Sequence, residues 1–143
     1  MIKNSGFSLL EVLIALIVLS VGLLGLAAIQ ITGLKNNQSA YYRTSATMLA
    51  YDMADRMRLN RSIAEAGGYD IAIADDAPTG TTLVDIDRIA WLNNLSTTLP
   101  VGDGAIEITT VGIKQIVDIT VQWNDTRGTS GSATQSFVVS TEL

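Results

Sequence analysis

One carboxylate stands out among the side chains that could do chemistry. Glu11 is the only charged residue between Phe7 and Ile29, in a stretch that is otherwise almost wholly apolar. An acidic group inside a membrane span costs about 2.5–3.5 kcal/mol on insertion scales, and such groups are usually paired and functional. No basic residue lies three or four positions away on either side. In a helix, the positive partner of Glu11 must therefore come from outside the segment.

A free N-terminal amine would be one source of that positive charge. If the chain were cut after Gly6, Phe7 would carry the amine one helical turn before Glu11. The same amine could meet Glu11 of a second, slightly staggered copy. Neutralisation of the carboxylate would then be coupled to assembly.

The residues that most enzymes and metal sites use are missing. The chain has no His and no Cys, which removes the commonest general base, any disulfide and any thiolate metal site. It has no GxxxxGK[ST] phosphate loop, no GxGxxG dinucleotide motif after a strand and no GxSxG nucleophile motif. We expect that the chain is not an enzyme and needs no cofactor.

Four aspartates raise the alternative of a calcium site. Their spacing does not match the helix–loop–helix calcium pattern, which needs oxygen ligands at alternate positions and a late Glu. Asp85 and Asp87 more simply favour the first turn of a helix that begins near Thr82. We therefore expect no metal at these residues, which are Asp75, Asp76, Asp85 and Asp87.

The segment 7–29 is long enough to cross a membrane. As a helix it would measure roughly 35 Å, whereas the apolar core of a signal peptide spans only about 7–15 residues. An uncleaved signal anchor would explain the hydropathy, and a cleaved signal peptide is the weaker alternative because no good cleavage site follows. Neither explains Glu11.

The sequence KNSGFSLLE at residues 3–11 resembles the class III signal of type IV pilins and pseudopilins. That signal is a short basic leader ending in Gly, followed by Phe and an apolar helix with Glu at its fifth position. The resemblance implies that a membrane prepilin peptidase cuts between Gly6 and Phe7 and methylates the new terminus, giving N-methylphenylalanine at Phe7. It also implies that Glu11 pairs with the N-terminus of a neighbouring subunit.

The helix that follows is most similar to PilV-type minor pilins. Residues 15–30 read ALIVLSVGLLGLAAIQ and resemble the LSxGLLGLAxxQ pattern of that group, and the segments ITVQWND and STEL resemble the close of its chains. Gly22 and Gly25 fit close helix–helix packing, with a melting site as the alternative. Many pilins close their C-terminal region with a disulfide. Here the last loop must be held by packing and hydrogen bonds alone.

The chain divides into four predicted parts: a leader (1–6), a transmembrane and assembly helix (7–29), an amphipathic continuation of that helix (30–61) and a globular α+β head (62–143). No proline interrupts 7–61, so we expect one helix of roughly 80 Å. Its outer half carries an apolar stripe at helical spacing, made of Tyr42, Ala46, Leu49, Ala50, Met53 and Met57. The methionines Met48, Met53 and Met57 are predicted to be core rather than a pliable binding groove.

The head is predicted to be a helix and an antiparallel meander. A helix over 83–98 ends at Pro100, and strands follow at 105–111, 116–123 and 134–141, with a turn at 112–115. One face of the second strand is apolar and should be covered by the long helix. Trp91 is predicted to be buried or half-buried rather than an exposed partner anchor. The fold class is α+β and pilin-like.

These features predict a minor pilin. It would sit in the bacterial inner membrane with its C-terminal domain in the periplasm, and join a surface pilus that serves twitching, adhesion or DNA uptake. Its partners would be prepilin peptidase, other major and minor pilins through the N-terminal helix, and the inner-membrane assembly platform. A pseudopilin of a type II secretion system is the alternative, and an enzyme or sensor on a plain anchor is the third.

The charge argues against direct binding of nucleic acid. The net charge is −5, and residues 62–143 carry eleven acidic side chains against three basic ones. An acidic head repels a phosphate backbone.

Overall fold

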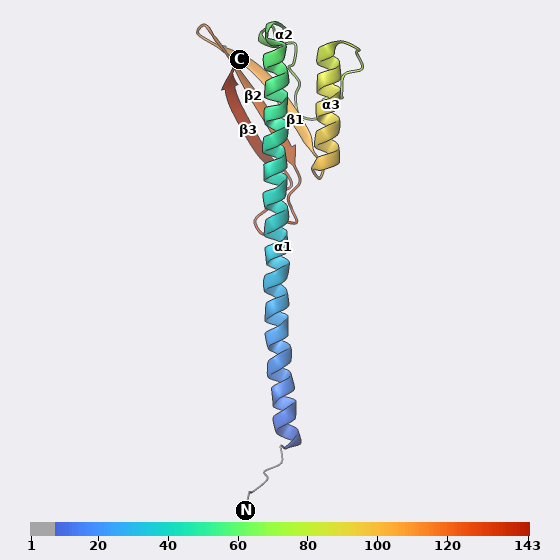
Figure 1. Cartoon of the computed structure of the whole chain (residues 1–143), viewed down its shortest axis with the longest axis vertical. Coiled ribbons are helices and arrows are strands. Elements are labelled where there is room, and N and C mark those ends of the chain that lie inside the picture. Colours follow the sequence, from blue (N-terminus) through green and yellow to red (C-terminus); the bar gives the residue numbers. More distant parts are fainter. Residues whose placement is uncertain (1–7) are drawn as a thin grey trace, which may run out of the picture.

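The computed structural model describes residues 8–143 and is dominated by one long helix that extends far beyond the head (Figure 1). In chain order the elements are α1 (Leu9–Leu59), α2 (Arg61–Glu65), α3 (Leu83–Thr98), β1 (Asp103–Val111), β2 (Lys114–Trp123) and β3 (Gln135–Glu142). The 51 residues of α1 make a rod of about 77 Å at 1.5 Å per residue. The predicted α+β, pilin-like fold is confirmed.

The outer half of α1 packs on the head through the predicted stripe. Its buried residues include Ala46, Ala50, Met53 and Met57, as expected. Met48 is 68% exposed, so its prediction as core is wrong. It lies five residues before Met53, which places it about 140° away around the helix. The helix ends at Leu59 rather than Arg61, and α2 follows directly.

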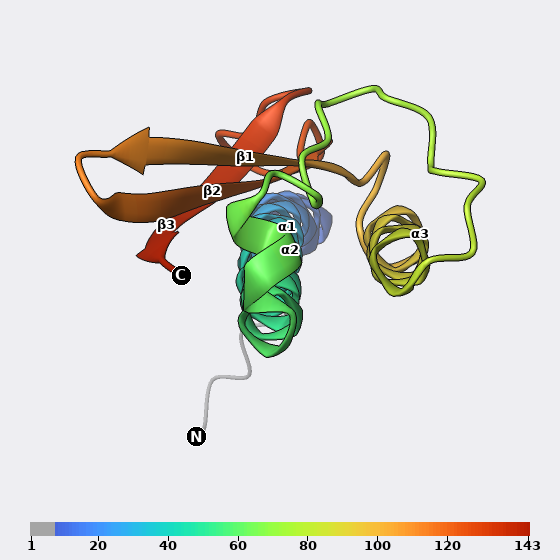
Figure 2. The same cartoon turned by 90° about the horizontal axis from the view of Figure 1, so that it is seen from above.

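The strands form one antiparallel sheet in the order β1-β2-β3. As predicted, Val117, Ile119, Val121 and Trp123 of β2 are buried on one face. α1 and α3 both lie on that side of the sheet, α1 against β2 and β3 and α3 against β1 (Figure 2). The core therefore fills the space between one layer of helices and one sheet.

The turn between β1 and β2 is tighter than predicted. Val111 pairs with Lys114, so only Gly112 and Ile113 form the turn and β2 begins two residues early. Gly112 has a φ of 68°, in the left-handed region that glycine adopts without cost. A glycine at the first position of a two-residue turn is typical of a type II′ hairpin.

α3 has the predicted bounds and packs closely on β1. Thr82 and Asp85 form a reciprocal capping box at its start. Trp91 is fully buried and its Nε1 donates a hydrogen bond to the carbonyl of Leu49 (2.9 Å), which confirms the buried interpretation. Gly104 makes this approach possible, because a Cβ at that position would overlap the side chains of Trp91 and Leu95.

Candidate functional site

The inner half of α1 is an apolar rod with no cover from the described residues. An 18-residue window near its N-terminal end has a mean hydropathy of 2.9, and none of that window is buried. Leu9 is 92% exposed and Leu24 is 71% exposed. A continuous apolar surface of this size needs lipid or another protein around it. By length and composition, the helix can cross a membrane.

Glu11 lies in the first turn of α1. Ser8 is the N-cap, and its Oγ accepts a hydrogen bond from the N–H of Glu11 (3.2 Å). A carboxylate here also faces the positive end of the helix dipole. The spacing Ser8-x-x-Glu11 is that of a capping box, a signal that the sequence analysis missed. Capping favours a Glu at this position, but Glu11 has no ion-pair partner within residues 8–143.

The predicted cleavage site is not placed by the structure. Gly6 and Phe7 lie outside the described residues, so cleavage and methylation there stay predictions. What the structure gives is the position of Glu11 at the end of α1 from which a new N-terminus would extend. The geometry is therefore compatible with a carboxylate that meets an amine contributed by another chain.

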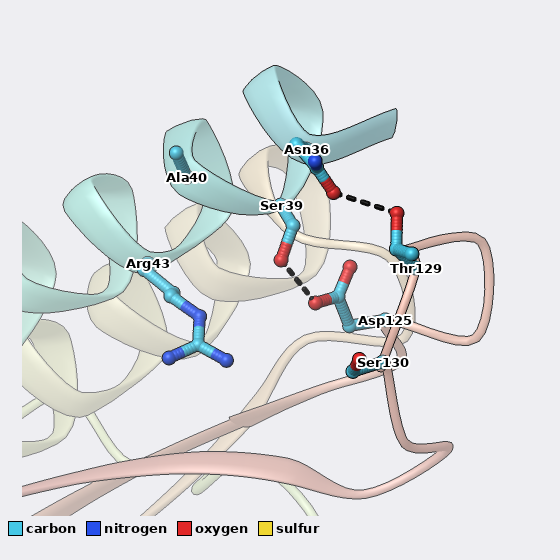
Figure 3. A pocket seen from close by; sticks show the side chains of 7 residues that line it. All are labelled: Asn36, Ser39, Ala40, Arg43, Asp125, Thr129 and Ser130. Atoms are coloured by element: carbon cyan, nitrogen blue, oxygen red, sulfur yellow. Dashed lines mark hydrogen bonds between the residues drawn. The ribbon is translucent and has the colours of Figure 1, made fainter. Parts of the chain in front are cut away.

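A hydrogen-bonded clamp holds α1 where it enters the head (Figure 3). Asp125 is only 3% exposed, and its Oδ2 accepts a hydrogen bond from the hydroxyl of Ser39 on α1 (2.5 Å). Thr129 donates to Oδ1 of Asn36, one turn earlier on α1 (2.6 Å). The loop over 124–133 is thus held by hydrogen bonds in the absence of a disulfide, as predicted.

The same loop also closes on itself. The backbone N–H of Asp125 donates to the carbonyl of Ser132 (2.8 Å), and that of Gly128 donates to the carbonyl of Asp125 (2.8 Å). Figure 3 shows the guanidinium of Arg43 directed towards the space beside Asp125. A cavity of about 280 Å³ lies there, lined by Ala40 and by polar side chains of α1 and the loop.

A second polar cluster joins α1 to α3. Asp87 accepts hydrogen bonds from Nη1 of Arg56 (3.0 Å) and from the hydroxyl of Tyr69 (2.8 Å), and Arg56 also pairs with Asp52 (2.9 Å). Asp87 is 9% exposed and is directed at α1, so its predicted role in the first turn of α3 is wrong. Asp85 alone occupies that role.

The charges of this region follow from these contacts. Burial opposes the charge on Arg56, but hydrogen bonds to Asp52 and Asp87 outweigh it and raise the pKa of Arg56. Burial, together with the hydrogen bond to Asp87, raises the pKa of Tyr69. Hydrogen bonds from Thr82 and then from Arg88 lower the pKa of Asp85. At neutral pH, Arg56 is therefore cationic, Tyr69 is neutral and Asp85 is anionic.

Three of the four aspartates considered for calcium serve other contacts. Asp75 accepts a hydrogen bond from the N–H of Ala72 (2.9 Å), while Asp85 caps α3 and Asp87 pairs with Arg56. Among residues 8–143, no group of three or more acidic side chains could hold a metal ion.

Comparison with known proteins finds a match at the N-terminus. The family model of the prokaryotic N-terminal methylation motif, the leader motif of type IV pilins, matches residues 1–27. This match supports the pilin and pseudopilin superfamily as the class of this chain. It includes Gly6, Phe7 and Glu11 but no residue of the head. No curated protein and no solved structure matches the chain.

Proposed function

We propose that this chain is a minor pilin, a structural subunit that waits in the inner membrane and then joins or primes a type IV pilus. One combination carries the proposal: the methylation motif leads directly into an apolar helix that residues 8–143 leave exposed. A leader alone would serve export, and an apolar helix alone would serve anchoring. Together with Glu11 at the start of that helix, they are what a subunit needs to pass from membrane to fibre.

The mechanism is assembly, and we propose no catalytic role. Prepilin peptidase would cut after Gly6 and methylate Phe7, leaving a positive terminus one turn before Glu11. In the fibre, Glu11 of one subunit would meet that terminus on a neighbour, which removes the cost of an unpaired carboxylate in apolar surroundings. Lys3 would stay on the cytoplasmic side and the head would face the periplasm.

The PilV-like pattern at residues 15–30 favours a pilus over a secretion system. A pseudopilin of a type II secretion system would share the leader, Phe7 and Glu11, so these residues do not separate the two. Deletion of the gene for this chain separates the two alternatives. A minor pilin predicts loss of surface fibres with protein secretion intact, and a pseudopilin predicts the reverse.

The mass of the purified protein tests the proposal directly. We expect a chain that begins at Phe7 and carries one additional methyl group on its N-terminal nitrogen. Gly6→Asp, which places a charged side chain at the predicted cleavage site, should give the full-length, unmethylated chain. A wild-type protein that keeps Met1 in cells with an active prepilin peptidase would overturn the proposal.

A further inference from the structure

The two edge strands of the sheet, β1 and β3, differ in whether their outer backbone groups have hydrogen-bond partners. On the outer edge of β1, Ile106 exchanges two backbone hydrogen bonds with Ile71 (2.9 and 3.0 Å), and the N–H of Ile108 donates to the carboxylate of Asp70 (3.2 Å). The outer edge of β3 has no backbone hydrogen-bond partner among residues 8–143. One edge is closed within the chain and the other is open.

The register fixes which backbone groups of β3 face outwards. Leu143 donates to the carbonyl of Gln115, so the odd-numbered residues of β2 direct their backbone groups at β3. Their partners in the register are the odd-numbered residues of β3, such as Val139 opposite Ile119. The even-numbered residues therefore direct N–H and C=O away from the sheet. They are Ser136, Val138, Ser140 and Glu142.

This edge lacks most of the features by which proteins usually protect an edge strand, and its one charged residue is Glu142 at the C-terminal end, which pairs with Lys114 of β2 (2.7 Å). Proline, lysine, a bulge or a covering segment normally prevents pairing with another chain. β3 contains neither proline nor lysine, and its register with β2 runs one-to-one from Gln135 to Glu142. The side chains of the four outward residues are all exposed, and Val138 is 51% exposed. Apart from the carbonyl of Glu142, which accepts a hydrogen bond from the hydroxyl of Thr141 (3.3 Å), the outward backbone groups of this edge have no partner among residues 8–143.

Apolar surface on α1 continues beside the open edge. Arg58 donates a hydrogen bond to the hydroxyl of Thr141 on β3 (3.0 Å), which places this face of α1 next to β3. Tyr51 lies seven residues before Arg58, so it is on the same face two turns earlier. It is 51% exposed. A strand added to β3 would cover Tyr51 with its inward side chains.

We propose that the outer edge of β3 binds an extended strand of a partner protein, which becomes a fourth strand of the sheet. Main-chain hydrogen bonds to the four outward residues would supply affinity, as in other cases of strand addition. An antiparallel strand with alternating apolar residues fits, because every second side chain would face Tyr51 and α1. The opposite side chains would face solvent.

The partner is a different protein and not a second copy. β3 runs in the same direction as α1 (Figure 1), so antiparallel pairing of two β3 edges would point one α1 away from the membrane that holds the other. The β1 edge of a second copy is closed by Ile71 and Asp70. The first of these two steps rests on the membrane orientation in the proposed function.

Two substitutions at Val138 in the full chain test the proposal in cells. Val138→Pro removes one outward N–H and leaves the ladder to β2 intact, since that ladder uses the odd-numbered residues. Val138→Thr keeps the N–H and the β-branched shape. A photo-crosslinking amino acid at Ser136 reports contact with the edge, and the same group at Thr110 on β1 is the control position.

We expect wild type and Val138→Thr to give a crosslink from position 136 to an extended segment of another protein, with no such product from position 110. Val138→Pro should reduce that product by about tenfold or more, because the partner loses a hydrogen bond and meets the proline ring. The unfolding midpoint of the Val138→Pro protein should stay close to that of Val138→Thr. Equal crosslinking in the two variants, or a product made of two copies of this chain, would overturn the proposal.

Amide hydrogen exchange on the purified full chain in detergent gives an independent measurement. The amides of Val138 and Ser140 should exchange at least about tenfold faster than that of Val139, because only the last is bonded within the sheet. Slow exchange at Val138 in the isolated chain would mean that the edge is already closed and would refute the idea. A chain found to keep Met1 would contradict the proposed function. It would leave the expected crosslinking and hydrogen-exchange results unchanged.

Discussion

At the scale of single residues, buried polar contacts decide how α3 sits on α1. Asp87 accepts hydrogen bonds from Arg56 on α1 and from Tyr69 in the segment between the helices. Tyr69 is fully buried, so its hydroxyl has no water to replace a lost acceptor. The contact therefore contributes more than an exposed ion pair would.

Asp87→Ala should lower the free energy of unfolding by about 1–3 kcal/mol, because a buried hydroxyl loses its acceptor while Arg56 keeps Asp52. Asp52→Ala removes only the exposed pair and should cost no more than about 1 kcal/mol. Denaturant titration of the full chain in detergent, followed by tryptophan fluorescence, measures both. Equal losses in the two variants would contradict the role given to Asp87.

Asp85 should make the head less stable in acid. Its pKa is lowered from 3.8 in the folded chain by hydrogen bonds from Thr82 and Arg88, so the native state binds fewer protons than the unfolded state. The stabilisation is fully present above about pH 5 and is lost as the pH falls through the folded pKa, below 3.8. Asp85→Asn should therefore be less stable than wild type at neutral pH, and the difference should shrink in acid.

Unfolding titrations of wild type and Asp85→Asn at several pH values measure this effect. Asp76→Asn is the matched control, because Asp76 is exposed and precedes the helix. It should change the free energy of unfolding by no more than about 0.5 kcal/mol. A difference between wild type and Asp85→Asn that stays constant from neutral to acid pH would argue against a lowered pKa.

At the scale of elements, strong periodic patterns were predictable and contacts between distant segments were not. The apolar stripe of α1, the bounds of α3 and the buried face of β2 all follow from spacing and capping residues. Met48 and Asp87 were misjudged because residue type was weighed without the direction of the side chain. The sequence pattern does not indicate which edge of the sheet the segment around Ile71 pairs with. It therefore could not predict that β1 is closed and β3 is open.

The clamp between α1 and the loop over 124–133 is another such contact. Ser39→Ala removes the hydroxyl that donates to the buried carboxylate of Asp125, so we expect a loss of about 1–2 kcal/mol in the free energy of unfolding. The amides of Asp125 and Gly128 should also exchange faster, because the loop loses its attachment to α1.

Thr44→Ala is the control for the clamp. The hydroxyl of Thr44 bonds to the carbonyl of Ala40 within α1 (3.0 Å) and does not reach the loop. Alanine is the better helix former, so this change should leave stability the same or slightly higher. A loss as large as that of Ser39→Ala would assign the effect to the helix rather than to the clamp.

At the scale of the whole molecule, the chain combines a folded head with an exposed apolar rod. The head buries one face of the outer half of α1, while the window at its inner end has no buried residue. Two explanations account for the carboxylate of Glu11 at the start of this rod: one acts within a chain and the other between chains. Capping stabilises α1 within one chain, whereas pairing with another N-terminus stabilises contact between chains.

Two substitutions of Glu11 separate these explanations. Glutamine also serves at the third position of a capping box, so Glu11→Gln keeps a capping side chain and removes the charge, whereas Glu11→Leu removes both. Either variant keeps the backbone N–H that donates to Ser8. If pairing between chains is the function, both variants should reach the membrane at wild-type levels and yet enter surface fibres about tenfold less or worse, since a buried charge-assisted contact is worth at least about 1.4 kcal/mol. The ratio of sheared-fibre protein to membrane protein measures this.

Ser8→Ala completes the comparison, because it removes the cap and keeps the charge. If Glu11 acts between chains, Ser8→Ala should enter fibres nearly as well as wild type, since the cap stabilises the helix by only about 1 kcal/mol and a membrane supports the helix in any case. If Glu11 acts as a cap, Ser8→Ala should fail and Glu11→Gln should succeed. The two explanations thus predict opposite orders for the same pair of variants, and a fibre containing Glu11→Gln at the wild-type level would assign the carboxylate to α1 alone.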